Sequence, residues 1–443
     1  MGQAAFRRTM WALAPAIAAF VVYAATFSAS FVYDDELLIR TNGWVTDASA
    51  LPQLAFKPLL ASPPAGTTNY YRPLVVVLYN VTWQSFGGRP LAFHLLNVLV
   101  HMLNATLVFQ LIRRVTGAQN ATAVGAALLF AVHPLNTEVV AWASGLPELT
   151  YTAFGLSALV LHILAWSWKD GPARRWNVAA WALFTLACLS KETALVVVPL
   201  VVLLELWLRP GCTPEARMRW RAAGRGAVPY LVAVALFLAA RTAVLGGFVP
   251  RGAHQLLTPG DAVLNAPWLL VQYLKAMLFP SPLLVEHIVP LVTSVADPRF
   301  LLAALLAAAG TTAILRLSRQ RPDLAFAASL AIVPLLPALY LPALGRVPFA
   351  ERYAYLGVVG MCWLVVGGAD ALLRRGPVSA PRWVLPALVG ALAIVASART
   401  VVRGGDWHDD GSLGRATLRG EPHASIGYML LGSWHVREGR KDD

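Results

Sequence analysis

Three consecutive acidic residues, Asp34, Asp35 and Glu36, follow the first long apolar stretch of the chain. Carboxylates at such a boundary could act as a general base or bind a metal ion. The alternative is a solvated stop after a helix, which would have no chemical role. Because the triplet lies between an apolar stretch and a long polar segment, we favour the chemical role, and the sequence leaves base and metal ligand both open.

Basic residues lie where apolar stretches are interrupted or end. Lys191 and Glu192 fall within the apolar region 176–208, where a charge at a helix centre costs about 2.5–3.5 kcal/mol. A lysine beside a helix N-terminus could bind phosphate, and Arg352 could offer paired donors to the same group. Arg241 lies near the end of another stretch. The alternative for Lys191 and Glu192 is an ion pair that closes a hairpin. For Arg352 the alternative is a charge at a helix start, and for Arg241 it is a side chain that snorkels to the membrane interface.

Histidines and asparagines share one face of the stretch 91–112, at spacings of three and four residues. They are His94, Asn97, His101 and Asn104. For the deeper pair we expect a seam of interhelical hydrogen bonds. His94 is nearest the predicted outer end, and a groove for a lipid phosphate is as well supported there as the seam.

His133 and Glu138 flank a turn that begins at Pro134. The proline breaks the helix and frees backbone groups, which a membrane tolerates only where protein or water satisfies them. The two side chains could hold an acceptor or orient an acid, and a packed, capped turn is the alternative.

The composition defines the elements that must position these residues. Of 443 residues, 57% are hydrophobic and 13% charged, against about 45–50% and about 25% in a soluble chain. The net charge of +13 does not indicate nucleic acid, because the basic residues fall between long apolar stretches. This pattern is typical of an all-α polytopic membrane protein.

Eleven apolar stretches approach the ~20 residues that a membrane span requires. We expect the region 176–208 to supply two short spans. The other nine are 10–29, 91–112, 119–140, 146–166, 227–248, 299–317, 324–344, 353–373 and 382–400. With eleven spans, half of the 36 basic residues fall on one side, which predicts a cytoplasmic N-terminus and an outer C-terminus.

Two outer segments follow from this topology. The first is the long loop 31–90, and the second is 249–298, in which residues 266–280 are predicted to form an interfacial helix. We assign 1–400 to a transmembrane catalytic domain and 401–443 to an extracytoplasmic tail.

The polar residues described above gather near the outer ends of at least six predicted crossings. A transporter would place such groups near the bilayer midplane, whereas an enzyme acting on a membrane-anchored substrate would place them at the surface. The sequence contains no P-loop, no GxGxxG, no zinc signature and no serine-hydrolase elbow.

Several segments occur in a recognisable order: YDDELLIRTN, NYYRPLVVVLYN, LAFHLLNVLVHMLNA, HPLNTEVVAWASGLPEL, LSKETALVVVPL and AERYAYLGVVG. Together they resemble the transmembrane and tetratricopeptide-repeat O-mannosyltransferases and their bacterial relatives, within the GT-C class of glycosyltransferases. The resemblance runs from about residue 30 to the C-terminus. It implies a GT-C-like helical bundle of about 11 transmembrane helices.

The resemblance also implies a mechanism, in which a hydroxyl attacks a polyprenyl-phosphate sugar with inversion. Asp35 is then the expected base, with Asp34 as the other candidate. The expected donor-phosphate ligands are Lys191, Arg352, Arg72 and Arg241. Residues expected to shape the site or the acceptor side are His133, Glu138, Glu36, His94 and Glu192.

Two parts of the chain qualify the resemblance. Relatives often carry Gly-Arg-x-Asp where this chain has Gly145-Leu146-Pro147-Glu148, which leaves the sugar and acceptor undefined.

In the tail, 407–418 resembles a linker and 421–440 resembles the first helix of a tetratricopeptide repeat. One half-repeat cannot bury a solenoid core, so the repeat domain is absent, truncated or supplied by another chain.

The expected function is therefore transfer of a mannose-like sugar from a polyprenyl-phosphate donor to a hydroxyl, at the outer face of a bacterial inner membrane. A protein serine or threonine is the favoured acceptor, and a glycan or lipid acceptor stays open. The alternatives are a transporter or flippase for a lipid-linked sugar, and an idle scaffold. No nucleic-acid partner is expected, no cofactor is certain, and a divalent metal is left open.

Overall fold

The computed structural model describes residues 3–63, 69–117, 120–166, 172–209, 216–247, 258–340, 348–375 and 381–439. Within these ranges every regular element is a helix. Part of the predicted second outer segment, 249–257, and the end of the tail, 440–443, lie outside the described residues.

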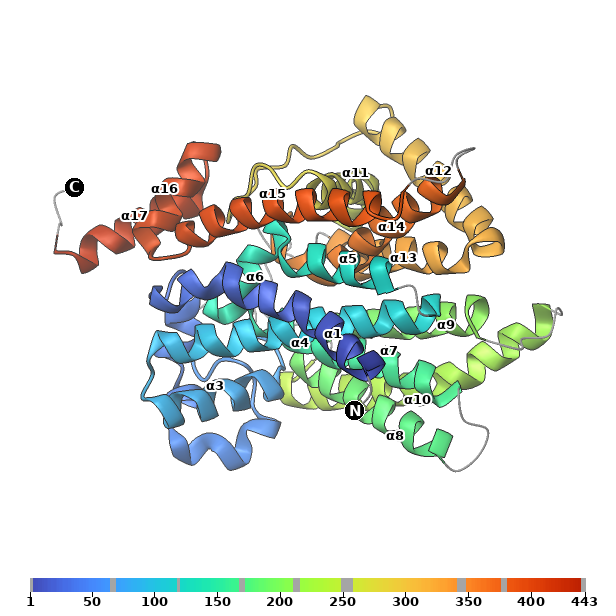
Figure 1. The fold of residues 1–443 in the computed structure, drawn as a ribbon. Helices are drawn as coiled ribbons and strands as arrows, with labels where there is room; N and C mark the ends of the chain where they lie inside the picture. Colours follow the sequence, from blue (N-terminus) through green and yellow to red (C-terminus); the bar gives the residue numbers. More distant parts are fainter. Residues whose placement is uncertain are drawn as a thin grey trace.

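The long helices coincide with the apolar stretches of the sequence. They are α1 (Gln3–Tyr23), α4 (Pro90–Thr116), α5 (Asn120–Ala131), α7 (Leu146–Trp166), α8 (Pro172–Ser190), α9 (Val197–Trp207), α10 (Ala216–Leu245), α11 (Pro259–Leu278), α12 (Pro298–Gln320), α13 (Pro322–Ile332), α14 (Tyr355–Arg375) and α15 (Val384–Asp406). Figure 1 shows α1, α4, α5 and α15 running roughly along one direction. A polytopic bundle of this kind satisfies its backbone hydrogen bonds within each helix.

Among the described residues, eight helices are long and apolar enough to cross a membrane, or nine if the bent pair of α5 and the next short helices counts as one span. This confirms an all-α, multi-pass membrane protein. The predicted count of eleven is higher because it includes α8 and α9, and neither belongs to the qualifying set. Helix α11, the predicted interfacial helix, does not belong to it either.

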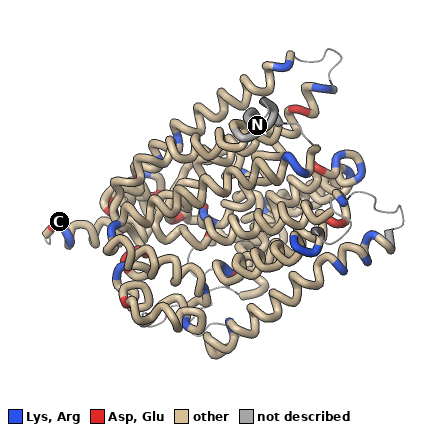
Figure 2. Tube along the Cα trace, turned by 60° about the horizontal axis from the view of Figure 1, so that its bottom comes forward, with Lys and Arg blue, Asp and Glu red and all other residues tan. Residues whose placement is uncertain are grey.

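The bundle buries an apolar core around α4, α5, α7 and α14, which includes Val108, Phe130, Leu156 and Trp363. Its outer helices instead expose large apolar side chains: Leu236 of α10 and Leu305 of α12 are 67% and 66% exposed. Outward-facing leucines are expected where the surroundings are lipid rather than water. Figure 2 shows basic residues concentrated at helix ends and turns.

The first outer segment is helical and has its own small core. It contains η2 (Glu36–Arg40), α2 (Gly43–Thr46), η3 (Ala48–Phe56) and α3 (Pro73–Phe86). Two buried asparagines tie it together: Asn42 Nδ2 donates to Leu59 O at 2.8 Å, and Asn80 Nδ2 donates to Asp47 O at 2.8 Å. The segment is therefore a structured cap beside the bundle.

The tail forms a pair of packed helices, α16 (Asp410–Gly420) and α17 (Ser425–Arg437). Most of the range expected to be a linker, 407–418, is thus helical. Figure 1 shows this hairpin at one end of the bundle, beyond α15. A small apolar cluster joins it to the bundle, formed by Val32, Trp142, Trp407, Leu413 and Leu430 with their neighbours.

Candidate active site

The acidic triplet begins immediately after a strained residue. Tyr33 has a φ of 54°, which is unusual for a residue with a side chain. Such a conformation persists only where the surroundings hold it, and it is often found at functional sites. It separates Val32, whose side chain is buried, from Asp34, which is partly exposed.

Asp35 is completely buried and satisfied by hydrogen bonds. Its Oδ1 accepts from the Ser144 amide at 2.8 Å and from the Ser144 hydroxyl at 2.5 Å, and its Oδ2 accepts from the Val32 amide at 3.0 Å. Burial raises the pKa of Asp35 to about 7, although the bonds from Ser144 and Val32 act in the opposite direction. This carboxyl anchors the loop after α1 to the turn that carries Ser144.

Asp34 has a different environment. Its side chain is only partly buried, and burial raises its pKa while the charge of Arg352 lowers it. Asp34 therefore lies within electrostatic range of a guanidinium and remains partly accessible. Of the two adjacent aspartates, it is the more accessible one.

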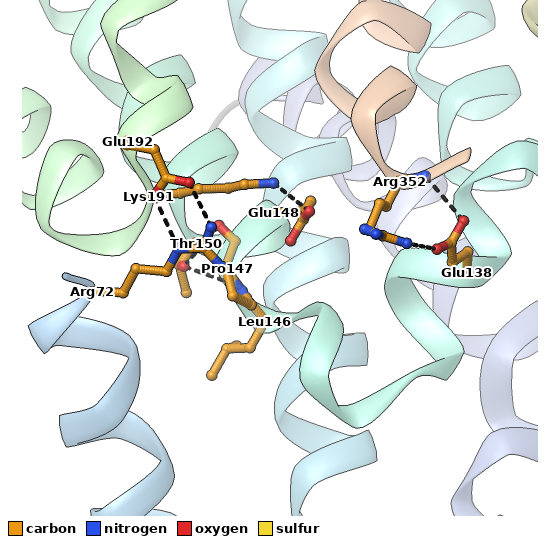
Figure 3. Close-up of polar contacts among 9 residues, drawn as sticks. All are labelled: Arg72, Glu138, Leu146, Pro147, Glu148, Thr150, Lys191, Glu192 and Arg352. Atoms are coloured by element: carbon orange, nitrogen blue, oxygen red, sulfur yellow. Dashed lines mark hydrogen bonds and ion pairs between the residues drawn. The ribbon is translucent and has the colours of Figure 1, made fainter. Parts of the chain in front are cut away.

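Arg352 lies in the short helix η9 (Glu351–Ala354), which leads into α14. Its Nη1 donates to Glu138 Oε1 at 2.7 Å, and its backbone N–H donates to Glu138 Oε2 at 3.1 Å (Figure 3). The guanidinium also lies over the rings of Trp142, at 5.7 Å, and Tyr353, at 5.1 Å. The carboxylate and both rings together fix the direction of the arginine.

Lys191 lies at the break between α8 and η6 (Glu192–Val196). Its ammonium group pairs with Glu148, and both side chains are about 95% buried (Figure 3). The ammonium lies 5.0 Å from the ring of Tyr353, which also contacts Arg352. Removing one partner of such a buried pair would leave a costly unpaired charge.

Arg72 precedes α3 and pairs with Glu192 through two hydrogen bonds, Nη2 to Oε1 at 2.6 Å and Nε to Oε2 at 3.0 Å (Figure 3). The two residues are 120 positions apart in the sequence. Bidentate geometry of this kind gives orientation as well as attraction. It joins the first outer segment to the end of α8.

Figure 3 thus shows three cation–carboxylate pairs close to one another, contributed by five different parts of the chain. The carboxylates reduce the desolvation cost of the cations. Each cation keeps N–H donors beyond those used in its pair, because a guanidinium has five and an ammonium has three. The cluster could therefore accept an anionic group such as phosphate without breaking the pairs.

The two candidate histidines have clear structural contacts. His133 caps η4 (Pro134–Asn136), since its Nδ1 accepts from Leu135 N at 3.2 Å, and its Nε2 lies 2.9 Å from Met277 O. His94 is buried, and its Nε2 lies 3.4 Å from Ser30 O. Both contacts support a packing role in the turn and in the seam along α4.

The deeper seam on α4 is held together as expected. His101 Nδ1 lies 2.6 Å from the Tyr355 hydroxyl, and Asn104 Nδ2 donates to the same hydroxyl at 3.1 Å. These bonds tie α4 to α14 and hold the helix that follows Arg352.

Two other predicted site residues lie apart from the three pairs. Glu36 forms an exposed pair with Arg40, at 3.2 Å between Oε2 and Nη1. Arg241 lies one turn before the end of α10 and is not a member of the three pairs.

Sequence reasoning did not assign a role to Glu148 or Ser144. Glu148 is the partner of Lys191, and the available signal was an acidic residue in an apolar stretch, which is costly unless paired. Ser144 had no such signal, because a serine in a small-residue turn is common. In the part of the chain that the structure describes, no three His, Cys, Asp or Glu side chains are grouped to hold a metal ion.

Comparison with known proteins supplies independent information. No known protein-family profile matches the chain. The protein O-mannosyl-transferase Tmtc1 of Drosophila melanogaster is 35% identical over 183 residues, covering 40% of this chain and 20% of the relative. The human protein O-mannosyl-transferase TMTC3 is 25% identical over 428 residues, covering 88% of this chain and 45% of the relative.

Among solved structures, the archaeal oligosaccharyltransferase AglB from Archaeoglobus fulgidus matches 93% of this chain and 56% of its own, with 14% identity and a TM-score of 0.47. The chain spans less than half the length of Tmtc1 and of TMTC3. Along most of its own length it is nevertheless similar in sequence to protein O-mannosyl-transferases, which confirms the resemblance carried by its motifs.

Proposed function

We propose that this protein is a glycosyltransferase that moves a mannose-like sugar from a polyprenyl-phosphate donor to a hydroxyl acceptor. The transfer takes place at the outer face of the membrane. The observation that carries the proposal is the cluster of three cation–carboxylate pairs (Figure 3), together with Asp34, which lies within electrostatic range of Arg352. A carboxylate base near a group of cations that can bind phosphate is what such a transfer needs. The similarity to protein O-mannosyl-transferases supports the same class of reaction.

In this proposal Asp34, rather than Asp35, is the general base. All three hydrogen bonds to Asp35 come from the protein itself, and the side chain is fully buried. Asp34 is partly exposed and lies within electrostatic range of Arg352. A base must reach the proton that it removes, and geometry decides this before pKa does.

The reaction balances with groups that the donor and acceptor supply. The acceptor oxygen bonds to the anomeric carbon on the face opposite the lipid phosphate, and the bond from that carbon to the phosphate oxygen breaks. The acceptor proton passes to Asp34, and the bonding electrons leave with the phosphate. Arg352, Lys191 and Arg72 stabilise the phosphate's developing charge through their remaining N–H donors.

The other predicted residues receive supporting roles or none. Glu138 and Glu192 orient two of the cations, and His133 holds the turn that carries Glu138. We assign no direct part to Arg241, His94 or Glu36. A protein serine or threonine is the proposed acceptor, and the proposed location is a bacterial inner membrane, with 1–400 as the catalytic domain and 401–443 as the outer tail.

The test is the substitution Asp34→Asn, assayed in membranes supplied with a polyprenyl-phosphate mannose donor and a serine- or threonine-containing acceptor. Loss of the base should lower the transfer rate about 10²–10⁴-fold. Glu36→Gln is the matched control, because Glu36 is an acid two positions from Asp34 that forms an exposed pair with Arg40, and it should stay near the wild-type rate. Equal rates for both variants would rule out Asp34 as the base. Donor movement across the membrane without any glycosylated product would support the transporter alternative instead.

A further inference from the structure

The strained residue that precedes Asp34 is held by the far end of the chain. The backbone N–H of Tyr33 donates to Asp410 Oδ1 at 2.8 Å, across a separation of 377 residues. A tyrosine with a φ of 54° needs such support, because the left-handed region is unfavourable for residues with a Cβ. The direction of Asp34 therefore depends on a contact with the tail.

Asp410 is well placed to keep this contact. It is 4% exposed, and it lies at the start of α16, where a helix N-terminus stabilises a carboxylate. Its second oxygen, Oδ2, pairs with Arg437 of α17. The two oxygens of one carboxylate thus connect the loop after α1 with both helices of the tail hairpin.

The hairpin itself is fixed on two further sides. Ser30 N donates to His408 O at 2.9 Å, directly beside the same loop. On the other side, Glu286 of the second outer segment accepts from Ile426 N at 2.7 Å, at the start of α17. The tail therefore contacts the loop after α1 and the second outer segment. Asp410 cannot move away from Tyr33 without breaking these contacts.

We infer that Asp410 is a positioning residue for the proposed transfer, and that the tail hairpin is part of the active site's framework. By accepting the hydrogen bond of Tyr33, Asp410 maintains the turn that aims Asp34 at the acceptor and at Arg352. This inference rests on the proposed function, since it assigns Asp410 to the same site. It predicts an effect on catalysis, with donor binding left unchanged.

The experiment compares Asp410→Ala, Asp410→Asn and Arg419→Gln in the full chain. Asn keeps an oxygen acceptor for Tyr33, and Ala does not. Arg419→Gln is the matched control, because Arg419 also pairs with an aspartate of the tail region, Asp406, but is 74% exposed. We expect Asp410→Ala to lower kcat by about 10²-fold with the donor KM nearly unchanged, since a shift of about 1 Å can cost this much. Asp410→Asn should restore most of the rate.

Hydrogen exchange of the amides in residues 30–36 gives a second readout that does not depend on activity. The Tyr33 amide should exchange faster in Asp410→Ala than in the Arg419→Gln control. An active Asp410→Ala enzyme, or unchanged exchange at Tyr33, would overturn the inference. A wild-type chain that transfers no sugar would contradict the proposed function alone, and the exchange experiment would still decide whether Asp410 holds the turn.

Discussion

At the scale of single residues, the two neighbouring aspartates show how environment separates roles. Asp35 is buried and bonded on both oxygens, whereas Asp34 is partly exposed and within electrostatic range of the Arg352 guanidinium. Identical side chains one position apart therefore differ in accessibility and in electrostatic partner. This difference sets both their pKa values and the tasks that we assign to them.

The proposed base should produce an acid limb in the pH dependence of kcat/KM. A carboxyl acts as a base only when ionised, so the rate falls as the pH drops through its pKa. Burial raises the pKa of Asp34, and the charge of Arg352 lowers it. We therefore expect the limb of Arg352→Gln to lie at a higher pH than that of the wild type. A pH–rate profile of both enzymes measures this, and an unmoved limb would contradict coupling between the two residues.

Asp35 should instead affect the pH dependence of stability. Its pKa in the folded protein, about 7, is above its ordinary value of 3.8, so the folded state binds this proton more tightly than the unfolded state. Stability is therefore lost as the pH rises from about 4 to about 7, by up to about 4 kcal/mol. Asp35→Asn should lack this part of the slope in thermal unfolding between pH 5 and pH 8. Parallel slopes for the variant and the wild type would show that Asp35 is not the titrating group.

At the scale of elements, close packing between α13 and α14 positions the helix that follows Arg352. Gly360 of α14 lies against the α13 backbone so closely that an added Cβ would meet Ala331 N at 2.2 Å and Ala327 O at 2.5 Å. Small residues allow membrane helices to approach in this way. Gly368 on the same helix has open space around it.

These two glycines provide a matched pair of substitutions. Gly360→Ala should destabilise the protein by about 1–3 kcal/mol, because the helices must separate to admit the methyl group. Gly368→Ala should be neutral or slightly stabilising, since alanine favours the helix. Thermal unfolding in detergent measures both effects. Similar melting temperatures for the two variants would refute the close packing of α13 and α14.

At the scale of the whole molecule, the bundle separates its charged groups from its apolar surface. The three ion pairs lie together, and the outward faces of helices such as α10 and α12 carry exposed leucines. In the part of the chain that the structure describes, eight or nine helices can cross a membrane by length and composition. The sidedness remains a prediction from the basic loops.

Cysteine labelling tests that sidedness. Ser49 in the first outer segment, His423 in the tail and Gln320 at the end of α12 are all exposed, whereas the native Cys188 and Cys362 are buried. An impermeant thiol reagent added to intact bacterial cells should label Ser49→Cys and His423→Cys, and should label Gln320→Cys only after permeabilisation. All variants carry Cys212→Ser. Labelling of Gln320→Cys in intact cells would invert the predicted topology or change the number of spans.

The sequence alone determined the class of protein, the helical stretches and the set of polar residues that could do chemistry. Hydropathy is a local property, since a membrane span of about 20 apolar residues can be recognised without knowing which helices pack against it. The cost of a charge in lipid likewise drew attention to Lys191 and Glu138 before any contact was known. The similarity to O-mannosyltransferases could also be recognised from the sequence, because it lies in short motifs that follow one another in a fixed order along the chain.

Only the tertiary structure decided which residues meet. Arg72 pairs with Glu192 across 120 positions, and Arg352 pairs with Glu138 across 214. The Tyr33 amide donates to Asp410 across 377 positions. The tertiary structure also gave Asp34 and Asp35 different environments. Asp35 is buried and hydrogen-bonded by Ser144, which lies over 100 residues away in the sequence. Pairings of this kind arise from the packing of whole helices, and no local pattern in the chain encodes them.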